Sequence, residues 1–211
     1  MLSHSLPFLR SWSRDPVAVG LPFASTCWTA RRLAHAVLDA AIPDGGPVLE
    51  LGAGTGPVTE ALIAAGCPLE RIIVVERDAE LCRTLSARFR GLQVLHGDAL
   101  EIEKMLAKAA VGSVGVVLSG LPMRAVAPRD AAQCYSGAFE LMPSGGAIIQ
   151  YTYGLRPPVD GPALEATFVG REWRNVPPMG IWSYRRAHEK EHDAGQEVNG
   201  GGIQLSCIGD R

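Results

Sequence analysis

With 211 residues, of which 47% are apolar and 20% charged, the chain has the composition of a globular protein with a substantial core. Its net charge of −2 gives no overall attraction to nucleic acid, and its five scattered cysteines disfavour zinc and a secreted disulfide framework. No apolar run is long enough to span a bilayer and no signal peptide is found, so we expect a cytoplasmic protein and a reducing environment.

The first 22 residues differ in composition from the rest of the chain. Phe8, Leu9 and Trp12 supply apolar bulk, whereas Arg10 and Arg14 supply positive charge. The spacing gives one apolar and one basic face, which is typical of a segment in a membrane interface. The alternative is that residues 1–22 pack over the remaining domain as a lid.

A helix is predicted to begin at Ser25 or Thr26, either of which is a good N-cap, and to run to about Ala41. Residues 43–47, P-D-G-G-P, are turn formers, so a turn is predicted between this helix and the apolar run that starts at Val48.

Beyond that run, apolar segments of strand length alternate with helical patterns. Strands are predicted at residues 72–75, 92–95, 114–118, 147–152, 166–170 and 181–184, and helices at 79–89, 100–110 and 129–141. Continuous Val, Ile and Leu strands between helices indicate an α/β fold whose parallel sheet is covered on both faces. The prediction is a Rossmann-like, mostly parallel, seven-stranded sheet that ends in an antiparallel hairpin around Pro177 and Pro178.

The stretch from Val48 to Gly56, V-L-E-L-G-A-G-T-G, predicts a strand followed by a loop whose glycines leave the backbone without side chains. A helix is predicted to begin at Pro57, which suits the first helical position. It does not match the dinucleotide pattern G-x-G-x-x-G, and no Lys-Ser/Thr follows that would indicate a Walker loop. Glu50 would repel a pyrophosphate but suits a cation. The block E-L-G-A-G-T-G resembles motif I of the class I S-adenosylmethionine-dependent methyltransferases, in which the acidic residue lies near the cationic methionine end of the cofactor.

Ligands of open α/β sheets bind outside the carboxyl ends of the strands, where further acidic residues stand. Glu76 can accept both ribose hydroxyls of an adenosine, and Arg77 either stacks on adenine or faces solvent. Asp98 resembles the residue that meets the adenine amino group in this superfamily; it can also cap the next helix. The resemblance implies a cofactor site made of Ser25, Glu50, Gly52, Ala53, Gly54, Thr55, Gly56, Glu76, Arg77, Asp98, Ala99 and Ser119.

The fourth strand ends in Ser119-Gly120-Leu121-Pro122-Met123, where the transferred methyl group should emerge. Base N-methyltransferases have N-L-P-Y or a relative in this loop, and its Asn or Asp accepts a hydrogen bond from the target amine. Gly120 occupies the Asn position and Met123 the aromatic position. Both changes count against adenine as the substrate.

Several aromatic and basic residues are predicted near the point where the methyl group should emerge, here called the mouth of the site. Aromatic faces attract methylated ammonium groups, and Arg forks hold phosphates. The candidate substrate residues are Arg174, Arg124, Trp182 and Tyr184, although alternate aromatic residues on strands can simply be packing. The expected catalytic residues are Gly120, which opens the loop, and Tyr151 or Tyr153, either of which, or a water, takes the amine proton.

From L-R-S-W at residues 9–12 to Arg186, the chain is similar to the bacterial phospholipid N-methyltransferases of the rRNA adenine dimethyltransferase-like type. The specific pieces are S-G-L-P, Q-Y-T-Y-G and W-R-N-V-P-P; the segment Phe23–Thr26 is less Ser-rich than is usual in that family. The resemblance implies a methyltransferase domain at residues 23–186 that uses S-adenosylmethionine, releases S-adenosylhomocysteine and converts phosphatidylethanolamine toward phosphatidylcholine.

That function implies a peripheral protein on the inner face of the cell membrane, with anionic lipids favoured, no nucleic acid, no metal and a monomeric state. Residues 187–211 hold five acidic and two basic residues and are expected to be a disordered tail. Two alternatives remain: an RNA adenine N-methyltransferase, and a non-catalytic binding protein with the same fold.

Overall fold

The computed structural model describes residues 26–41, 46–175 and 177–187. The predicted N-terminal segment 1–22, Ser25 and the tail beyond residue 187 lie outside the described residues. In the described part of the chain, no helix is long and apolar enough to cross a bilayer.

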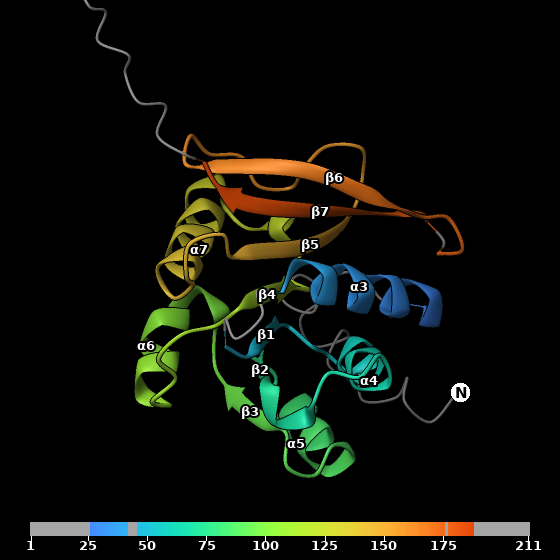
Figure 1. The fold of residues 1–211 in the computed structure, drawn as a ribbon, viewed down its shortest axis with the longest axis vertical. Helices are drawn as coiled ribbons and strands as arrows, with labels where there is room; N and C mark the ends of the chain where they lie inside the picture. The colour runs from blue at the N-terminus through green and yellow to red at the C-terminus, as the bar shows by residue number, and fades with distance from the viewer. Residues whose placement is uncertain (1–25, 42–45, 176, 188–211) are drawn as a thin grey trace, which may run out of the picture.

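A seven-stranded sheet forms the centre of the described molecule, with strand order β3-β2-β1-β4-β5-β7-β6 (Figure 1). The first five strands in that order pair in parallel, and β7 pairs antiparallel with both β5 and β6. The predicted fold is therefore confirmed. The strands are β1 Val48–Leu51, β2 Ile72–Glu76, β3 Gln93–His96, β4 Val116–Ser119, β5 Ala147–Tyr153, β6 Leu164–Glu172 and β7 Met179–Arg186.

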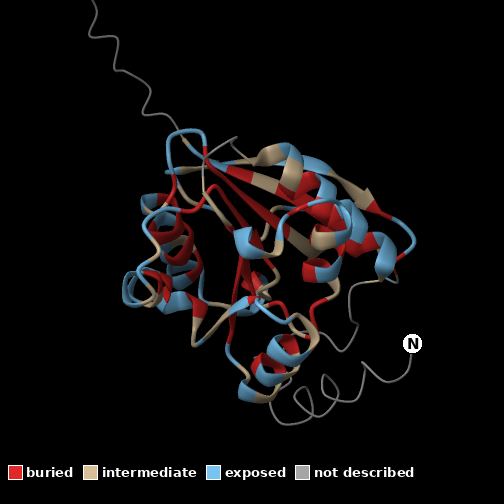
Figure 2. Cartoon of the chain, turned by 60° about the horizontal axis from the view of Figure 1, so that its bottom comes forward, coloured by how far each residue is buried: buried red, intermediate tan, exposed pale blue. Residues whose placement is uncertain are grey.

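Helices cover both faces of the sheet. One core cluster joins α3 (Cys27–Ala40), α4 (Pro57–Ala64) and Leu85 of α5 (Ala79–Arg88) to residues of β1, β2 and β4. The other joins α6 (Ile102–Lys108) and α7 (Pro128–Glu140) to the opposite side of the same strands. Side chains therefore alternate between two cores along β1, and the buried residues lie inside the layers (Figure 2).

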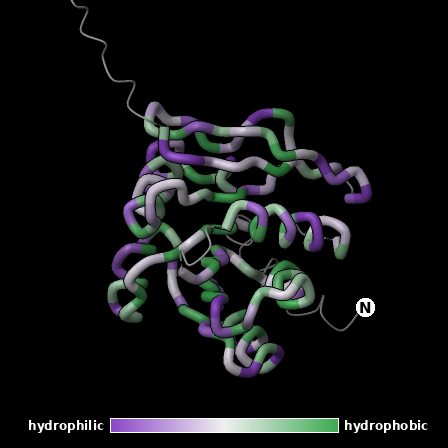
Figure 3. Tube along the Cα trace, viewed as in Figure 1, coloured by the Kyte–Doolittle hydropathy of each residue, from purple (hydrophilic) through white to green (hydrophobic). Residues whose placement is uncertain are grey.

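The hydropathy of the trace follows this layering. Apolar segments run through the interior, whereas polar segments recur on the outer turns (Figure 3). In β1 the pattern has one exception, because Glu50 points toward the α4 side and is buried there. A buried carboxylate is costly unless it is hydrogen-bonded, and Glu50 has such a partner in the hydroxyl of Thr59 on α4.

Several predicted elements have different bounds in the structure. The helix predicted at residues 100–110 begins as a 3-10 turn, Ala99–Glu101 (η2), because Asp98 caps that turn, and continues as α6 only to Lys108. The hairpin strands are longer than the predicted 166–170 and 181–184, and a bulge interrupts β6 between Phe168 and Gly170. The ends of these two strands contain mixed polar and apolar residues, so their hydrophobic periodicity does not show where the strands begin and end.

Hydrogen bonds between loops fix the edge where the parallel strands end. The N–H of Gly52 donates to the carbonyl of Val75 at 2.8 Å, and the N–H of Gly120 donates to the carbonyl of Leu51 at 2.8 Å. The loops after β1 and β4 are thus held against their neighbouring strands. This edge carries the candidate site.

Candidate functional site

The three glycines of the loop between β1 and α4 all have positive φ, but their surroundings differ. A Cβ at Gly56 would meet Phe89 Cε2 at 2.7 Å, so this glycine allows the loop to pack on the end of α5. A Cβ at Gly54, whose φ is 61°, would have nothing within 4 Å. Gly54 therefore presents bare backbone to open space, which is what a ligand cradle requires.

Glu76, at the end of β2, organises this cradle. Its Oε2 accepts the N–H of Gly54 at 2.9 Å, and its Oε1 accepts the N–H groups of Arg77 and Asp78 at 2.8 and 3.0 Å. A carboxylate has about four acceptor positions, so these bonds leave room for a ligand hydroxyl. The buried carboxylate is held in one orientation before any ligand binds.

Asp98 lies two residues after His96, the last residue of β3, which is paired with Glu76 at the end of β2, so both carboxylates lie at the same edge of the sheet. Its Oδ1 accepts the N–H of Leu100 at 3.0 Å, so it caps η2, while the residue stays partly exposed. Ala99 is buried beneath it, and Arg77 is exposed at the rim. The geometry allows the capping role and a ligand contact at once.

Glu50 has a different environment from Glu76. It is buried, and its Oε2 accepts the hydroxyl of Thr59 at 2.7 Å. Burial raises the pKa of Glu50 from 4.5 to about 7; the Thr59 hydrogen bond opposes this rise, and the charge of Glu76 adds to it. A cation placed near Glu50 would favour its ionised form, so the site is suited to a positively charged ligand.

The loop after β4 is where the structure adds most to the sequence prediction. A Cβ at Gly120 would lie 2.7 Å from the carbonyl oxygen of Gly52 and 3.0 Å from the hydroxyl of Tyr151. An asparagine therefore does not fit at this position, and the Tyr151 hydroxyl occupies the space where its side chain would begin. Met123 is buried in the core and offers no stacking surface, and Ser119 is buried at the end of β4.

A buried network that the sequence prediction missed holds this loop in place. The hydroxyl of Tyr135 on α7 donates to Gln150 Oε1 at 2.5 Å, and Gln150 Nε2 donates to the carbonyls of Leu121 and Tyr151. Gln150 thus ties the loop after β4 to β5. The motif Q-Y-T-Y-G contained this residue, but no local pattern indicated which side chain bridges the two strands.

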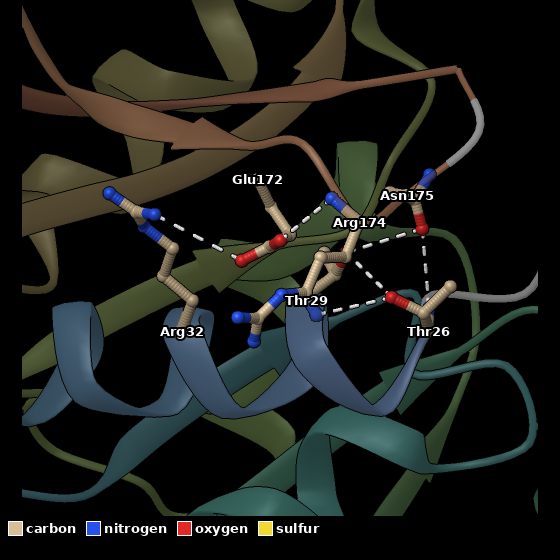
Figure 4. A network of polar contacts seen from close by, with 6 residues as sticks. All are labelled: Thr26, Thr29, Arg32, Glu172, Arg174 and Asn175. Carbon is tan, nitrogen blue, oxygen red and sulfur yellow. Dashed lines mark hydrogen bonds and ion pairs between the residues drawn. The ribbon is translucent and has the colours of Figure 1, made fainter.

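A second network joins the start of α3 to the tip of the β6–β7 hairpin (Figure 4). Asn175 Oδ1 accepts the backbone N–H of Thr26 at 3.3 Å and the hydroxyl of Thr29 at 3.2 Å. Its Nδ2 donates to the carbonyl of Pro177 at 2.9 Å and reaches the Tyr153 hydroxyl at 3.5 Å. Sequence reasoning did not assign Asn175 a role, because its partners are up to 149 residues away in the chain.

The candidate substrate residues fall into two groups. Arg174 and Arg124 are exposed: the Arg174 guanidinium lies 4.3 Å from the centre of the Trp28 ring, and Arg124 Nη2 donates to the carbonyl of Arg156. Trp182 and Tyr184 are core residues on the α7 side. The Tyr184 hydroxyl accepts the N–H of Val159, which gives this side chain a structural role.

Tyr151 and Tyr153 follow each other at alternate positions at the end of β5, and both are partly buried. Burial raises the pKa of Tyr153, and the hydrogen bond from Asn175 opposes that rise. Among the described residues, no group of three His, Cys, Asp or Glu side chains is arranged to hold a metal.

Known proteins with similar sequences include lipid-modifying and RNA-modifying enzymes. The chain is 31% identical over 152 residues to an ornithine lipid N-methyltransferase of Singulisphaera acidiphila, in a match that covers 67% of this chain and 77% of that protein. It is 36% identical over 91 residues to ribosomal RNA small subunit methyltransferase A of Rhodospirillum rubrum. That match covers 40% of this chain and 29% of the relative's length.

Solved structures show the same fold. An O-methyltransferase of Bacillus cereus in complex with SAH superimposes with a TM-score of 0.60 at 12% identity, covering 89% of this chain and 92% of that one. No protein-family model matches the chain. The lipid-modifying relative is thus matched over most of its length, and the RNA-modifying relative over less than a third.

Proposed function

The chain belongs to the bacterial lipid N-methyltransferases of the rRNA adenine dimethyltransferase-like type, in the class I S-adenosylmethionine-dependent superfamily, and on that premise we propose that it methylates phosphatidylethanolamine and its mono- and dimethyl derivatives. It transfers methyl groups from S-adenosylmethionine and releases S-adenosylhomocysteine. The acceptor amine belongs to a lipid at a membrane surface, and the product series leads toward phosphatidylcholine.

The residues at the strand ends fit this cofactor. Gly54 leaves open space above a bare backbone, and Glu76 holds an oriented carboxylate beside it with one free acceptor position for a ribose hydroxyl. Asp98 stands on the neighbouring strand end for the adenine, and buried Glu50 suits the positive methionine end. When bound, the cofactor supplies a methyl group activated by its sulfonium charge.

The observation that carries the choice of acceptor is the contact between Gly120 and Tyr151. A flat base needs an acceptor side chain and a stacking partner on the loop after β4. The Gly52 carbonyl at 2.7 Å leaves no room for a side chain at position 120, and Met123 is buried. A thin alkyl amine needs only a narrow opening, so the loop favours an ethanolamine headgroup.

Tyr151 and Tyr153 are proposed to orient the amine. A primary amine has a pKa near that of lysine, about 10, and must lose a proton before it attacks. A neutral phenol can accept a hydrogen bond from the amine but does not hold a second proton, and burial keeps Tyr153 neutral by raising its pKa. The two hydroxyls therefore position the nitrogen, while the proton passes to water.

Arg174 and Arg124 are proposed to hold the lipid phosphate. Both are exposed at the mouth, on the hairpin tip and on the loop after β4 respectively. A guanidinium binds phosphate through two parallel hydrogen bonds. Arg174→Ala should lower kcat/KM on phosphatidylethanolamine roughly 10- to 150-fold, equivalent to about 1.5–3 kcal/mol, with cofactor affinity unchanged. Normal turnover of lipid by this variant would remove Arg174 from the site.

A second lipid acceptor is favoured by the ornithine lipid N-methyltransferase relative. An ornithine headgroup presents an amine but no phosphate. The proposed phosphate contacts of Arg174 and Arg124 would therefore distinguish the two acceptors. The test is to incubate the protein with radiolabelled S-adenosylmethionine and, separately, phosphatidylethanolamine vesicles, ornithine lipid vesicles and total RNA. Label in phosphatidylethanolamine supports the proposal. Label confined to ornithine lipid would replace the acceptor, and label confined to RNA would overturn the lipid assignment.

A further inference from the structure

Two exposed tryptophans, each covered by an arginine, stand at one end of the molecule. Arg174 lies over Trp28 at 4.3 Å, and Arg171 lies over Trp173 at 5.4 Å. Trp28 is 44% exposed and Trp173 is 70% exposed, although large aromatic side chains are usually buried. The first pair joins two elements, since Trp28 lies in the first turn of α3 whereas Arg174 belongs to the tip of the β6–β7 hairpin. Arg171 and Trp173 both belong to that hairpin tip.

The contacts of Asn175 make these two elements one unit. Through this residue the hairpin tip is bonded to Thr26 and Thr29 at the start of α3, and Arg32 of α3 forms an ion pair of 3.9 Å with Glu172 (Figure 4). The hairpin tip and the start of α3 lie side by side at the same end of the molecule (Figure 1). These contacts therefore hold the two Trp–Arg pairs close together in fixed relative positions.

This end of the molecule combines exposed apolar side chains with exposed charges that are mainly positive. Phe168 and Val169 of β6 are also exposed, at 48% and 46%, and Arg171 lies 5.8 Å from the Phe168 ring. Within residues 26–32, 154–158 and 166–175, Glu172 is the one acidic residue, and it is buried and paired with Arg32. The exposed charges in these segments are arginines, so the surface complements an anionic partner.

Among anionic partners, a surface of exposed tryptophan and arginine side chains is better suited to a lipid bilayer than to a nucleic acid. Tryptophan is enriched where its ring can lie at the headgroup level of a bilayer. A polybasic surface gains about 1 kcal/mol per Lys or Arg near anionic lipid. A nucleic acid would also attract the arginines, but it gives no reason for exposed Phe168 and Val169 beside them.

This surface adjoins the proposed mouth of the site. Arg171 Nη2 approaches the carbonyl of Gly154 at 3.4 Å, and Gly154 directly follows Tyr153 at the end of β5. Tyr153 is in turn within 3.5 Å of Asn175. A bilayer that met the tryptophan–arginine pairs would therefore bring its headgroups to the end of β5, without a lipid having to leave the membrane.

Arg31 of α3 is also exposed and lies 5.7 Å from the centre of the Trp28 ring. We propose that the surface formed by Trp28, Arg31, Phe168, Arg171, Trp173 and Arg174, here called the hairpin surface, docks on an anionic bilayer with Trp173 at the headgroup level. The inference rests on the proposed lipid substrate. It adds a membrane contact, built into the methyltransferase domain, that sets the orientation of the mouth.

The test measures partitioning of the full chain, with S-adenosylhomocysteine present, onto vesicles of phosphatidylcholine and phosphatidylglycerol. These vesicles offer no amine acceptor, so the readout does not depend on turnover. Replacing Arg31 and Arg171 by Gln should weaken partitioning roughly 30-fold, because each basic residue near the surface contributes about 5-fold. The matched control, Arg83→Gln with Arg90→Gln, makes the same charge change on exposed residues on α5 and directly after it and should leave partitioning nearly unchanged.

Trp173→Phe provides an independent measurement. Brominated lipid quenches tryptophan that lies at the headgroup level, so the quenched part of the fluorescence should fall when Trp173 is replaced. Replacing Arg31 and Arg171 by Lys keeps both charges and should retain most of the partitioning that the double Gln variant loses, which separates a charge effect from misfolding. Equal partitioning of the Arg31/Arg171 variant and its control, or quenching unchanged by Trp173→Phe, would overturn the proposal.

These outcomes are separate from those of the proposed function. Radiolabel found only in RNA would overturn the lipid acceptor whatever the vesicle result. Conversely, labelled phosphatidylethanolamine together with unchanged partitioning of the variants would leave the function standing and remove the hairpin surface.

Discussion

Replacing Glu50 by Gln should stabilise the cofactor-free protein at neutral pH. Burial raises the pKa of Glu50 from 4.5 to about 7. Because an acid with a raised pKa in the folded state binds its proton more tightly there, the contribution of Glu50 to the free energy of unfolding is highest below pH 4.5. It falls as the pH rises toward 7 and then levels off. At about 1.4 kcal/mol per pH unit, the loss amounts to about 3 kcal/mol.

The variant removes this loss because Gln does not ionise, while its amide oxygen can still accept the Thr59 hydroxyl. The free energy of unfolding, measured by urea unfolding at pH values from 4.5 to 8, should fall for the wild type relative to the variant as the pH rises to about 7. Above that pH the difference between the two proteins should stay constant. Glu70→Gln, at an exposed position, is the control and should follow the wild type. Parallel curves for wild type and Glu50→Gln over the whole range would refute the assignment of Glu50 as a buried, proton-binding carboxylate.

Three further predictions follow from the site. Replacing Glu76 by Ala, or separately Asp98 by Ala, should weaken S-adenosylmethionine binding by about 1.5–3 kcal/mol, the range for hydrogen bonds to charged groups, and calorimetry showing unchanged affinity for both would remove this adenosine site. Gly120→Ala forces a Cβ to within 2.7 Å of the Gly52 carbonyl oxygen, so it should cost about 1–3 kcal/mol of unfolding free energy and lower methyl transfer; a fully active, equally stable variant would show that the loop can yield. Asn175→Ala leaves the Thr26 N–H and the Thr29 hydroxyl without this acceptor and should cost about 1–3 kcal/mol in urea unfolding, whereas an unchanged midpoint would mean that the hairpin tip is held by other contacts.

The parts of the fold that were predictable are those in which neighbouring residues carry the signal. The run from Val48 to Pro57 contains the strand, the turn and the helix start within ten positions, and the alternation of apolar and helical segments then predicts a parallel sheet. Glu50 and Glu76 are found at strand ends for the same local reason. The mostly parallel sheet with its antiparallel hairpin is confirmed, because such strands and helices have few ways to connect.

The parts that were not predictable depend on contacts between distant segments. The hydrogen bond from Thr29 to Asn175 spans 146 positions, and that between Tyr135 and Gln150 depends on how α7 packs against β5. Whether an aromatic residue on β7 faces a core or the mouth also depends on this packing, and Tyr184 faces a core. The close approach of Tyr151 to Gly120 was likewise invisible, because the sequence shows a missing side chain but not what fills its space.

The lipid acceptor is tested by mass spectrometry of phosphatidylethanolamine vesicles incubated with the protein and S-adenosylmethionine. We expect headgroups heavier by one, two or three methylene units, with the first addition appearing before the others. Glu76→Ala should lose these products through loss of cofactor, whereas the Arg83/Arg90 control variant should retain them. Vesicle lipids that stay unmodified, while the same preparation methylates RNA, would contradict the proposed lipid acceptor.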